Sequence, residues 1–245
     1  MKEVLYTIPL NDALNLGGEC PFCHIEKEIE QDLLDFVLGS GSSYMESDVR
    51  EMTDKEGFCR PHFKKMYEYG NTLGNAWILK THFKKINAEF REEVRRFSPG
   101  KRSLKDRLTG ADTPGSHMSE WLNEKNNSCY ICKRASETYD RYIATFFHMY
   151  RKETDFAERL KATKGFCLSH FRDIMAASYS ELSGKEQEDF YPMMFKLMEE
   201  NLLRLEEDVS WLVEKFDYRN KDADWKNSKD AVQRGMQKLK GGLYE

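Results

Sequence analysis

All six cysteines of the 245-residue chain lie in two similar motifs that could each bind a metal ion. Each motif is a Cys-x-x-Cys pair followed, after nearly the same interval, by Gly-Phe-Cys-x-x-His-Phe. The first set of candidate ligands is Cys20, Cys23, Cys59 and His62, and the second is Cys129, Cys132, Cys167 and His170. Three thiolates and one imidazole make up a closed tetrahedral zinc site. The sequence therefore predicts two zinc ions per chain, one in each of two related halves.

The spacing within each motif suits this chemistry. A gap of two residues lets both sulfurs of a Cys-x-x-Cys pair point at one ion, about 2.3 Å away in a zinc site. A cysteine and a histidine on the first turn of a helix would approach the same ion from the other side. Gly57 and Gly165 lie two residues before the third cysteine of each set and permit the backbone turn that brings it in. Because the ligands lose protons on binding, folding should be coupled to metal binding.

Other interpretations of these cysteines fit less well. An iron-sulfur cluster held by three thiolates and one histidine stays open as an alternative. A catalytic zinc is disfavoured because four protein ligands leave no position for water. The string from Cys20 to His24 matches covalent haem attachment, but that needs an exported chain, and the second copy has Lys133 in place of the histidine. A glutaredoxin-type redox pair would begin a helix after a strand, in an α/β fold that this sequence does not predict.

The composition favours a cytoplasmic protein. Charged residues are 33% of the chain, the net charge is -4 and the sequence pI is near 6.0, so no global charge marks a nucleic-acid binder. The amino terminus has an early acid, Glu3, and no uninterrupted apolar run, so no secretory signal is expected. No stretch approaches the roughly 20 apolar residues of a membrane span, so no membrane partner is expected. The cytoplasm keeps thiols reduced, which favours metal binding over disulfides.

Apolar residues recur at helical spacing through most of the chain, and strand signals are nearly absent. In the first half, helices are expected after Cys23 and from Pro61 to the mid-nineties, the latter interrupted at Gly70 and Gly74. In the second half, a helix is expected after Cys129, and a long one is expected near the end of the chain. The predicted fold class is all-α.

The repeat divides the predicted fold into two zinc-binding helical halves. The first half is residues 1–97 and the second is residues 116–245, each built around its own Cys-x-x-Cys and Cys-x-x-His motifs. Residues 98–115 combine turn formers with positive charge, so they form the expected flexible linker.

Two other groups of residues are candidate binding sites. Asp217, Tyr218, Arg219 and Arg234 lie in a segment richer in hydrogen-bonding side chains than a helix connection needs, so they form either a rigid connection or a ligand-binding surface. Basic residues also gather in one third of the chain, where acidic residues dilute them. They are Lys80, Lys84, Lys85, Arg91, Arg95, Arg96, Lys101, Arg102, Lys105 and Arg107.

With these motifs, the chain resembles an uncharacterised family of clostridial and other Firmicutes proteins that is described only as a domain of unknown function. The resemblance spans nearly the whole chain. It rests on the stretches Cys20–Cys23, Tyr44–Arg50, Gly57–Phe63, Asn71–Gly74, Lys215–Asn220 and Asn227–Ala231. It implies membership and an anaerobic bacterial source, but no mechanism.

The sequence is therefore interpreted as a zinc-stabilised cytoplasmic binding or adaptor protein that presents a helical groove between its halves to a protein or small-molecule partner. No catalytic residue is assigned. One alternative is a nucleic-acid-binding regulatory protein that uses the basic third of the chain. Another is an enzyme with a site near Asp217–Arg219, although no phosphate-binding glycine loop, dinucleotide fingerprint or catalytic triad order supports a named reaction.

Overall fold

The computed structural model describes residues 4–41, 43–97 and 116–243. Within these ranges the chain forms eleven α-helices, two short 3-10 helices and no strand, so the all-α prediction is confirmed. The expected linker, residues 98–115, lies outside the described residues. In the part of the chain that the structure describes, no helix is both long and apolar enough to cross a lipid bilayer.

The chain folds into two compact units whose boundaries differ from the expected halves. Unit 1 contains Met1–Ile29 and Glu137–Glu245, and unit 2 contains Glu30–Ser136. Both boundaries fall inside helices, namely α2 (Pro21–Leu38) and α8 (Tyr130–Lys152). Unit 2 therefore includes residues on both sides of the expected linker, and the repeat in the sequence does not correspond to the compact units.

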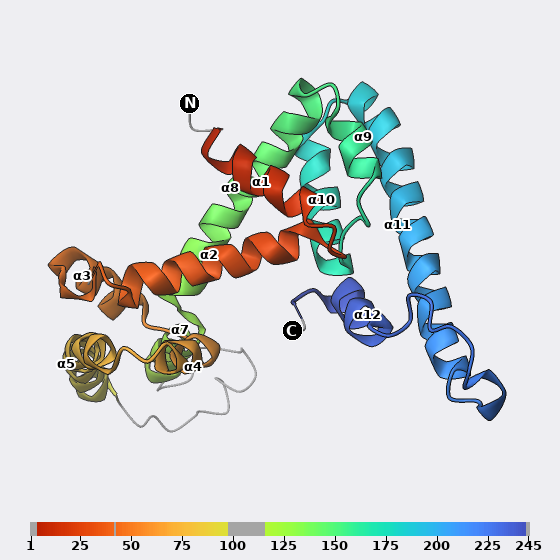
Figure 1. Cartoon of the computed structure of the whole chain (residues 1–245). Coiled ribbons are helices and arrows are strands. Elements are labelled where there is room, and N and C mark those ends of the chain that lie inside the picture. The colour runs from red at the N-terminus through yellow and green to blue at the C-terminus, as the bar shows by residue number, and fades with distance from the viewer. Residues whose placement is uncertain (1–3, 42, 98–115, 244–245) are drawn as a thin grey trace, which may run out of the picture. The chain divides into compact units, whose positions relative to one another are not determined.

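Unit 1 is organised around a core of aromatic side chains. Besides the parts of α2 and α8, it contains α1 (Val4–Asn15), α9 (Phe156–Lys161), α10 (Leu168–Glu181), α11 (Gly184–Glu214), η2 (Tyr218–Asn220) and α12 (Ala231–Lys240). Helix α12 lies beside α11 (Figure 1). The fully buried phenylalanines of this core are Phe22, Phe146, Phe147, Phe156, Phe166 and Phe190. Two of them, Phe22 and Phe166, belong to the cysteine motifs, so the core includes residues from both of these motifs.

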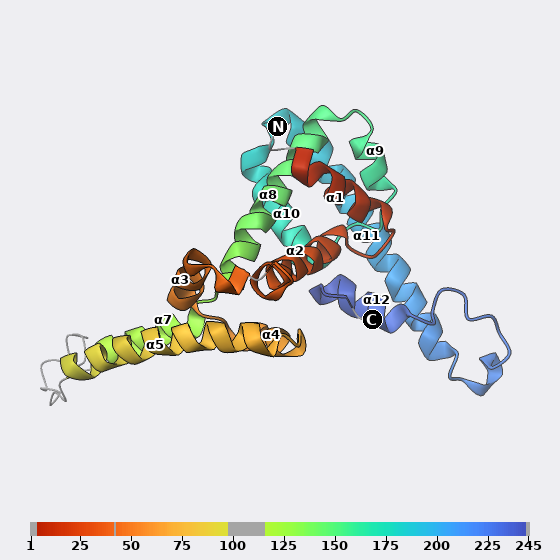
Figure 2. The same ribbon diagram turned by 60° about the vertical axis from the view of Figure 1, so that its left-hand side comes forward.

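Unit 2 has a smaller core that is mainly aliphatic. It contains the remainder of α2, the first residues of α8, and η1 (Ser43–Met45), α3 (Ser47–Glu56), α4 (Arg60–Glu68), α5 (Thr72–Arg96) and α7 (Ser116–Asn127). Helices α5 and α7 lie side by side (Figure 2). The buried core consists of Leu34, Val37, Leu38, Tyr44, Phe58, Met66, Ile78, Cys129, Tyr130 and Ile131. A ligand cysteine and its two following residues are thus part of this core.

The expected interruption near Gly70 and Gly74 separates α4 from α5. Gly70 has a φ of 84°, a left-handed conformation that favours glycine. Asn71 caps α5, because its side chain accepts a hydrogen bond from the Gly74 backbone N–H at 2.8 Å. The same side chain donates to the carbonyl of Leu38 at 2.7 Å. A Cβ at Gly74 would approach Asn71 and Leu38 to about 3 Å, so this position needs a glycine.

Candidate metal centres

The structure brings all eight predicted metal ligands together in two clusters, but it exchanges the motifs between the halves of the sequence. We call Cys20, Cys23, Cys167 and His170 centre 1, and Cys59, His62, Cys129 and Cys132 centre 2. In each centre the four ligand atoms lie within 4.8 Å of one another. The expectation that each Cys-x-x-Cys pair shares an ion with the Cys-x-x-His of its own half is therefore wrong. Each centre combines one motif from each half, and lies within one unit.

Helix lengths give the physical reason for this exchange. Helix α2 begins within the first Cys-x-x-Cys pair, at Pro21, and its 18 residues carry the chain about 27 Å along its axis. The next helix, α3, has only 10 residues, or about 15 Å, before the chain reaches Cys59. In the second half, α8 has 23 residues and α9 only 6, or about 35 Å against about 9 Å. The short helix in each half is too short to bring the chain back along the length of the long helix. The Cys-x-x-His motif of each half therefore lies away from the Cys-x-x-Cys pair of the same half.

All four motifs lie at helix N-termini. Cys59 and Cys167 are the N-cap residues of α4 and α10, with extended backbone (φ -73° and -69°), and each histidine follows on the first helical turn. Cys20 and Cys129 immediately precede α2 and α8. The backbone N–H groups and the dipole at a helix N-terminus stabilise negative charge, and they lower the cost of forming a thiolate. Each centre therefore receives two helix N-termini that favour its anionic ligands.

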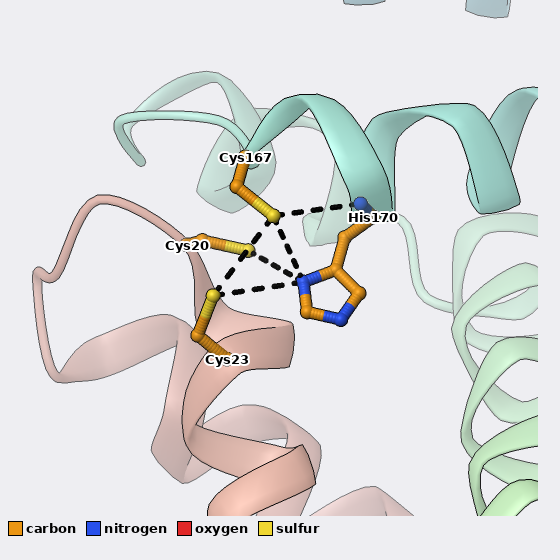
Figure 3. Close-up of side chains that lie close together, drawn as sticks. All are labelled: Cys20, Cys23, Cys167 and His170. Atoms are coloured by element: carbon orange, nitrogen blue, oxygen red, sulfur yellow. Dashed lines mark hydrogen bonds between the residues drawn. The ribbon is translucent and has the colours of Figure 1, made fainter. Parts of the chain in front are cut away.

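The side chains of centre 1 point toward one another (Figure 3). The Nδ1 atom of His170 lies 3.2 Å from the Cys20 sulfur, 3.6 Å from the Cys23 sulfur and 3.1 Å from the Cys167 sulfur. The sulfurs of Cys23 and Cys167 are 3.9 Å apart. All four residues are buried. Three sulfurs and one ring nitrogen thus surround a single point.

Centre 2 repeats this arrangement. The Nδ1 atom of His62 lies 3.1 Å from the Cys59 sulfur, 3.2 Å from the Cys129 sulfur and 3.4 Å from the Cys132 sulfur. The sulfurs of Cys59 and Cys132 are 3.8 Å apart. Unlike centre 1, this cluster reaches the surface, because Cys132 is exposed and Cys59 is half-buried.

The donor sets and their spacing fit a tetrahedral metal ion. Sulfurs bound to zinc at about 2.3 Å and tetrahedral angles would be about 3.8 Å apart, close to the 3.8 and 3.9 Å distances observed. Partial burial and the neighbouring thiols of Cys129 and Cys59 raise the pKa of Cys132 to about 12, because three thiolates this close repel one another. A bound cation removes this repulsion. The structure therefore supports two metal-binding clusters of three cysteines and one histidine.

Each ligand histidine is held by a carboxylate on its second ring nitrogen. His170 Nε2 lies 3.1 Å from Glu26 Oε2, and His62 Nε2 lies 2.9 Å from Glu30 Oε1. Lys65 in turn pairs with Glu30. Such a carboxylate fixes the ring orientation and leaves Nδ1 free to bind a metal. Both glutamates lie on α2, three and seven residues after Cys23.

Helix α12 covers centre 1. Lys238 is 1% exposed, and its ammonium group donates to the carbonyls of Glu19 at 2.9 Å and Lys164 at 2.5 Å, in the loops that carry Cys20 and Cys167. Lys238 also pairs with the buried Glu19 carboxylate at 3.4 Å. Burial lowers the pKa of Lys238, and the Glu19 charge opposes this effect. Helix α12 is therefore hydrogen-bonded to both of the loops that carry ligands of centre 1.

The backbone after α12 lies directly against the centre 1 sulfurs. A Cβ placed on Gly241 would be 3.3 Å from the Cys167 sulfur and 3.7 Å from the Cys23 sulfur. Gly241 also has a φ of 82°, which favours glycine. Centre 2 is linked differently, since the Tyr130 N–H donates to the Gly57 carbonyl at 2.9 Å. The corresponding residue of centre 1 is Pro21, which has no N–H to donate.

The other candidate residues form local ion pairs. Asp217 accepts hydrogen bonds from the backbone and guanidinium of Arg219 at 2.7 to 3.0 Å, and this pairing lowers the pKa of Asp217. Arg234 instead pairs with Asp208 and Asp230, both at 2.9 Å. Tyr218 is exposed. Asp217 and Arg219 thus form one ion pair, and Arg234 belongs to a different set of ion pairs.

A buried lysine organises this connection. Lys215 Nζ donates to the carbonyls of Asn220, Lys221 and Ala223 at 2.6 to 3.0 Å, and it lies 4.9 Å from the centre of the Trp225 ring. Three carbonyl acceptors and one aromatic face satisfy the buried ammonium group. Lys215 therefore holds the loop between α11 and α12 in place.

Several basic residues of α5 are paired with acids on the same helix. Arg95 and Arg96 both contact Glu92, at 3.3 Å each, and Lys85 lies 3.9 Å from Glu89. These pairs dilute the positive charge of the described part of the basic region. Its other predicted members, Lys101, Arg102, Lys105 and Arg107, lie outside the described residues.

Sequence reasoning missed the residues that support the two centres. Glu26 and Glu30 resemble ordinary solvent-facing acids of an amphipathic helix, and only their distance from Cys23 hints at a role. Glu19 and Lys238 are 219 positions apart, so no local pattern links them. Gly241 is the C-cap of α12, a common place for glycine, so its position in the sequence does not reveal that it lies against the sulfurs of Cys23 and Cys167.

Taken together, the fold and the two clusters define an all-α protein with two groups of side chains, each of three cysteines and one histidine, that could bind a metal ion. The whole chain, residues 1–245, matches the model of the family described as "Family of unknown function (DUF6062)", and it belongs to that family. The expected resemblance is thereby confirmed. No curated protein and no solved structure matches the chain.

Proposed function

We propose that the protein is a zinc-stabilised helical binding protein of the cytoplasm. The observation that supports a structural role for zinc is the complete ligand set of each centre, which leaves no coordination position for a substrate. Zinc fits three thiolates and one imidazole in tetrahedral geometry, whereas magnesium and calcium prefer oxygen ligands. Reduced thiols are needed throughout, which the cytoplasm maintains.

The binding role is supported by an exposed apolar stripe on α11. The stripe consists of Phe195, Leu202, Leu203, Val209 and Val213, and we call it the α11 stripe. A shallow groove lies along part of it, lined by Phe195, Met198, Glu199, Leu202 and Leu203. Residues seven apart recur on one face of a helix, so most of the stripe faces a single direction. A long apolar stripe on a surface helix marks an interaction site more often than an isolated exposed side chain does.

Acidic residues border the stripe and indicate the chemistry of its partner. Glu200, Glu207 and Glu214 are exposed and recur every seven residues, next to Leu203 on the helix surface. Glu199 and Glu206, also exposed, lie within the stripe itself. An apolar surface with this much negative charge fits a basic amphipathic helix of a partner protein. This is the ligand class that we propose.

The zinc part of the proposal is tested by elemental analysis of the protein purified without added metal under anaerobic conditions. We expect about two zinc atoms per chain and a colourless solution, and removal of zinc by a chelator should lower the helical circular dichroism signal. If the protein instead contained iron and sulfide and absorbed visible light, the zinc proposal would be wrong and the iron-sulfur alternative would be supported.

The binding part is tested with a labelled basic amphipathic peptide and a matched peptide in which the lysines are replaced by glutamates. We expect the basic peptide alone to bind, with affinity that falls as salt is raised. Leu203→Asp should weaken binding about tenfold or more, whereas Tyr179→Asp, at an exposed site on α10, should not. Equal binding of both peptides, or no effect of Leu203→Asp, would contradict the proposed surface.

A further inference from the structure

The two centres differ in their access to solvent although their sulfurs are equally close. Cys23 and Cys167 of centre 1 are 3.9 Å apart and buried. Cys59 and Cys132 of centre 2 are 3.8 Å apart, and Cys132 is exposed while Cys59 is half-buried. A small oxidant dissolved in water can therefore reach the sulfur of Cys132, whereas α12 and Gly241 cover the sulfurs of centre 1.

We propose that Cys132 and Cys59 form a site of oxidative modification, at which hydrogen peroxide converts two zinc-bound thiolates into a disulfide and releases the zinc of centre 2. This inference rests on the proposed zinc content. It assigns centre 2 a chemical reactivity that centre 1 does not share.

The reaction consists of two steps, and the oxidant comes from outside the protein. The Cys132 thiolate attacks one oxygen of hydrogen peroxide, which breaks the O–O bond, forms a sulfenic acid and releases hydroxide. The Cys59 thiolate then attacks the Cys132 sulfur, which forms the S–S bond and releases a second hydroxide. The two sulfurs lose two electrons in total, the peroxide gains them, and solvent protonates both hydroxides to water. Zinc loses two of its four ligands and dissociates.

The position of Cys132 supports its role as the attacking thiolate. It lies in the first turn of α8, where the N-terminal dipole and backbone N–H groups stabilise a thiolate in the presence of zinc. Cys129, its partner in the motif, is part of the unit 2 core and is buried. Cys59, the other near sulfur, comes from a different segment and is itself partly accessible. The thiolate that attacks the peroxide and the thiolate that then forms the disulfide are therefore the two most accessible ones of the protein.

Loss of this zinc should loosen unit 2 in particular. Centre 2 joins the N-termini of α4 and α8, and a disulfide between Cys59 and Cys132 leaves His62 and Cys129 without a metal. Unit 1 retains its own covered centre and its aromatic core.

The experiment treats the full-length zinc-loaded protein with increasing hydrogen peroxide. Zinc content is measured before treatment, zinc release is followed with a chromogenic chelator, and disulfides are located by peptide mass spectrometry after alkylation of remaining thiols. We expect about one of two zinc atoms to be released first, together with a Cys59–Cys132 disulfide, while the cysteines of centre 1 stay reduced and protected. Reducing agent and zinc should restore the starting state.

The outcomes separate this inference from the proposed function. Absence of zinc before treatment would refute the zinc proposal itself. Two zinc atoms at the start, with both retained, both released together, or a disulfide between Cys129 and Cys132, would overturn the assignment of Cys59 and Cys132. Early trapping of a sulfenic acid on Cys132 of the wild-type protein with dimedone would support it, and trapping on Cys129 or on a centre 1 cysteine in place of Cys132 would refute it.

Discussion

Centre 1 and centre 2 have the same ligand types, the same order of distances and the same placement at helix N-termini, but their surroundings differ. Centre 1 is buried, its loops are joined by Lys238, and it packs against a core of six fully buried phenylalanines. Centre 2 opens to solvent at Cys132 and packs against a smaller core. We therefore propose that the same ligand set forms a lasting structural link in centre 1, where it is covered, and a link that an oxidant can break in centre 2, where it is exposed.

The largest expected effect is the loss of a ligand from centre 2. Cys129→Ser should remove on the order of 10 kcal/mol of zinc-coupled free energy from unit 2, because metal binding and folding are linked. Hydrogen exchange measured by mass spectrometry should show α3 and α4 exchanging freely, with α9 to α11 still protected. The matched variant Cys20→Ser should cause a smaller loss of exchange protection in unit 1, because the aromatic core of that unit remains. If unit 1 lost more protection than unit 2, the proposed difference in metal dependence between the two units would be wrong.

The next effect concerns the cover of centre 1. Lys238→Met should destabilise unit 1 by about 3 kcal/mol, because it leaves the buried carbonyls of Glu19 and Lys164 without this donor and removes one of the three cationic partners of the Glu19 carboxylate. It should also make centre 1 release zinc faster to a competing chelator, so that the rates of zinc release from the two centres become more similar. Lys240→Met, at an exposed position of the same helix, is the control and should change neither quantity. Unchanged zinc release from Lys238→Met would show that α12 does not protect the centre.

A smaller effect is expected from the carboxylates that hold the histidines. Glu30→Ala should weaken zinc binding at centre 2 about 10-fold to 100-fold, since it frees the His62 ring. Glu26→Ala should have a weaker effect on centre 1, because the Glu26 side chain is 54% exposed and that of Glu30 is 27% exposed. Zinc affinity measured by competition with a chelator tests both, with Glu28→Ala on the same helix as control. If Glu26→Ala weakened zinc binding more than Glu30→Ala, exposure of the carboxylate would not determine its contribution.

The smallest effect lies outside both centres. Ser183 caps α11 in a capping box with Glu186. Ser183→Ala should lower the free energy of unfolding by about 1 kcal/mol in urea titration. It should leave zinc affinity at both centres unchanged. A change in zinc binding from this variant would mean that general stability, and not the local cover, sets the difference between the centres.

The sequence predicted the helical fold and all eight candidate ligands, because both depend on local patterns: helical periodicity, and cysteines spaced for one ion. It did not predict which motifs combine, since the two intervals are nearly equal and motif spacing alone favours the nearest partner. The lengths of α2 and α8 decide the combination, and those helices are visible in the sequence. The cover provided by Lys238 and Gly241 depends on contacts between residues far apart in the chain, which one sequence does not reveal.

The exchange of motifs between the two halves is the central claim, and thiol labelling in one double variant tests it most directly. Cys20→Ser combined with Cys23→Ser removes two ligands from one centre, and the remaining cysteines are then alkylated and mapped by mass spectrometry. We predict that Cys167 becomes reactive while Cys59 stays protected by zinc, with about one zinc atom left per chain. Labelling of Cys59 with protection of Cys167 would show that each half binds its own ion, and would contradict the account.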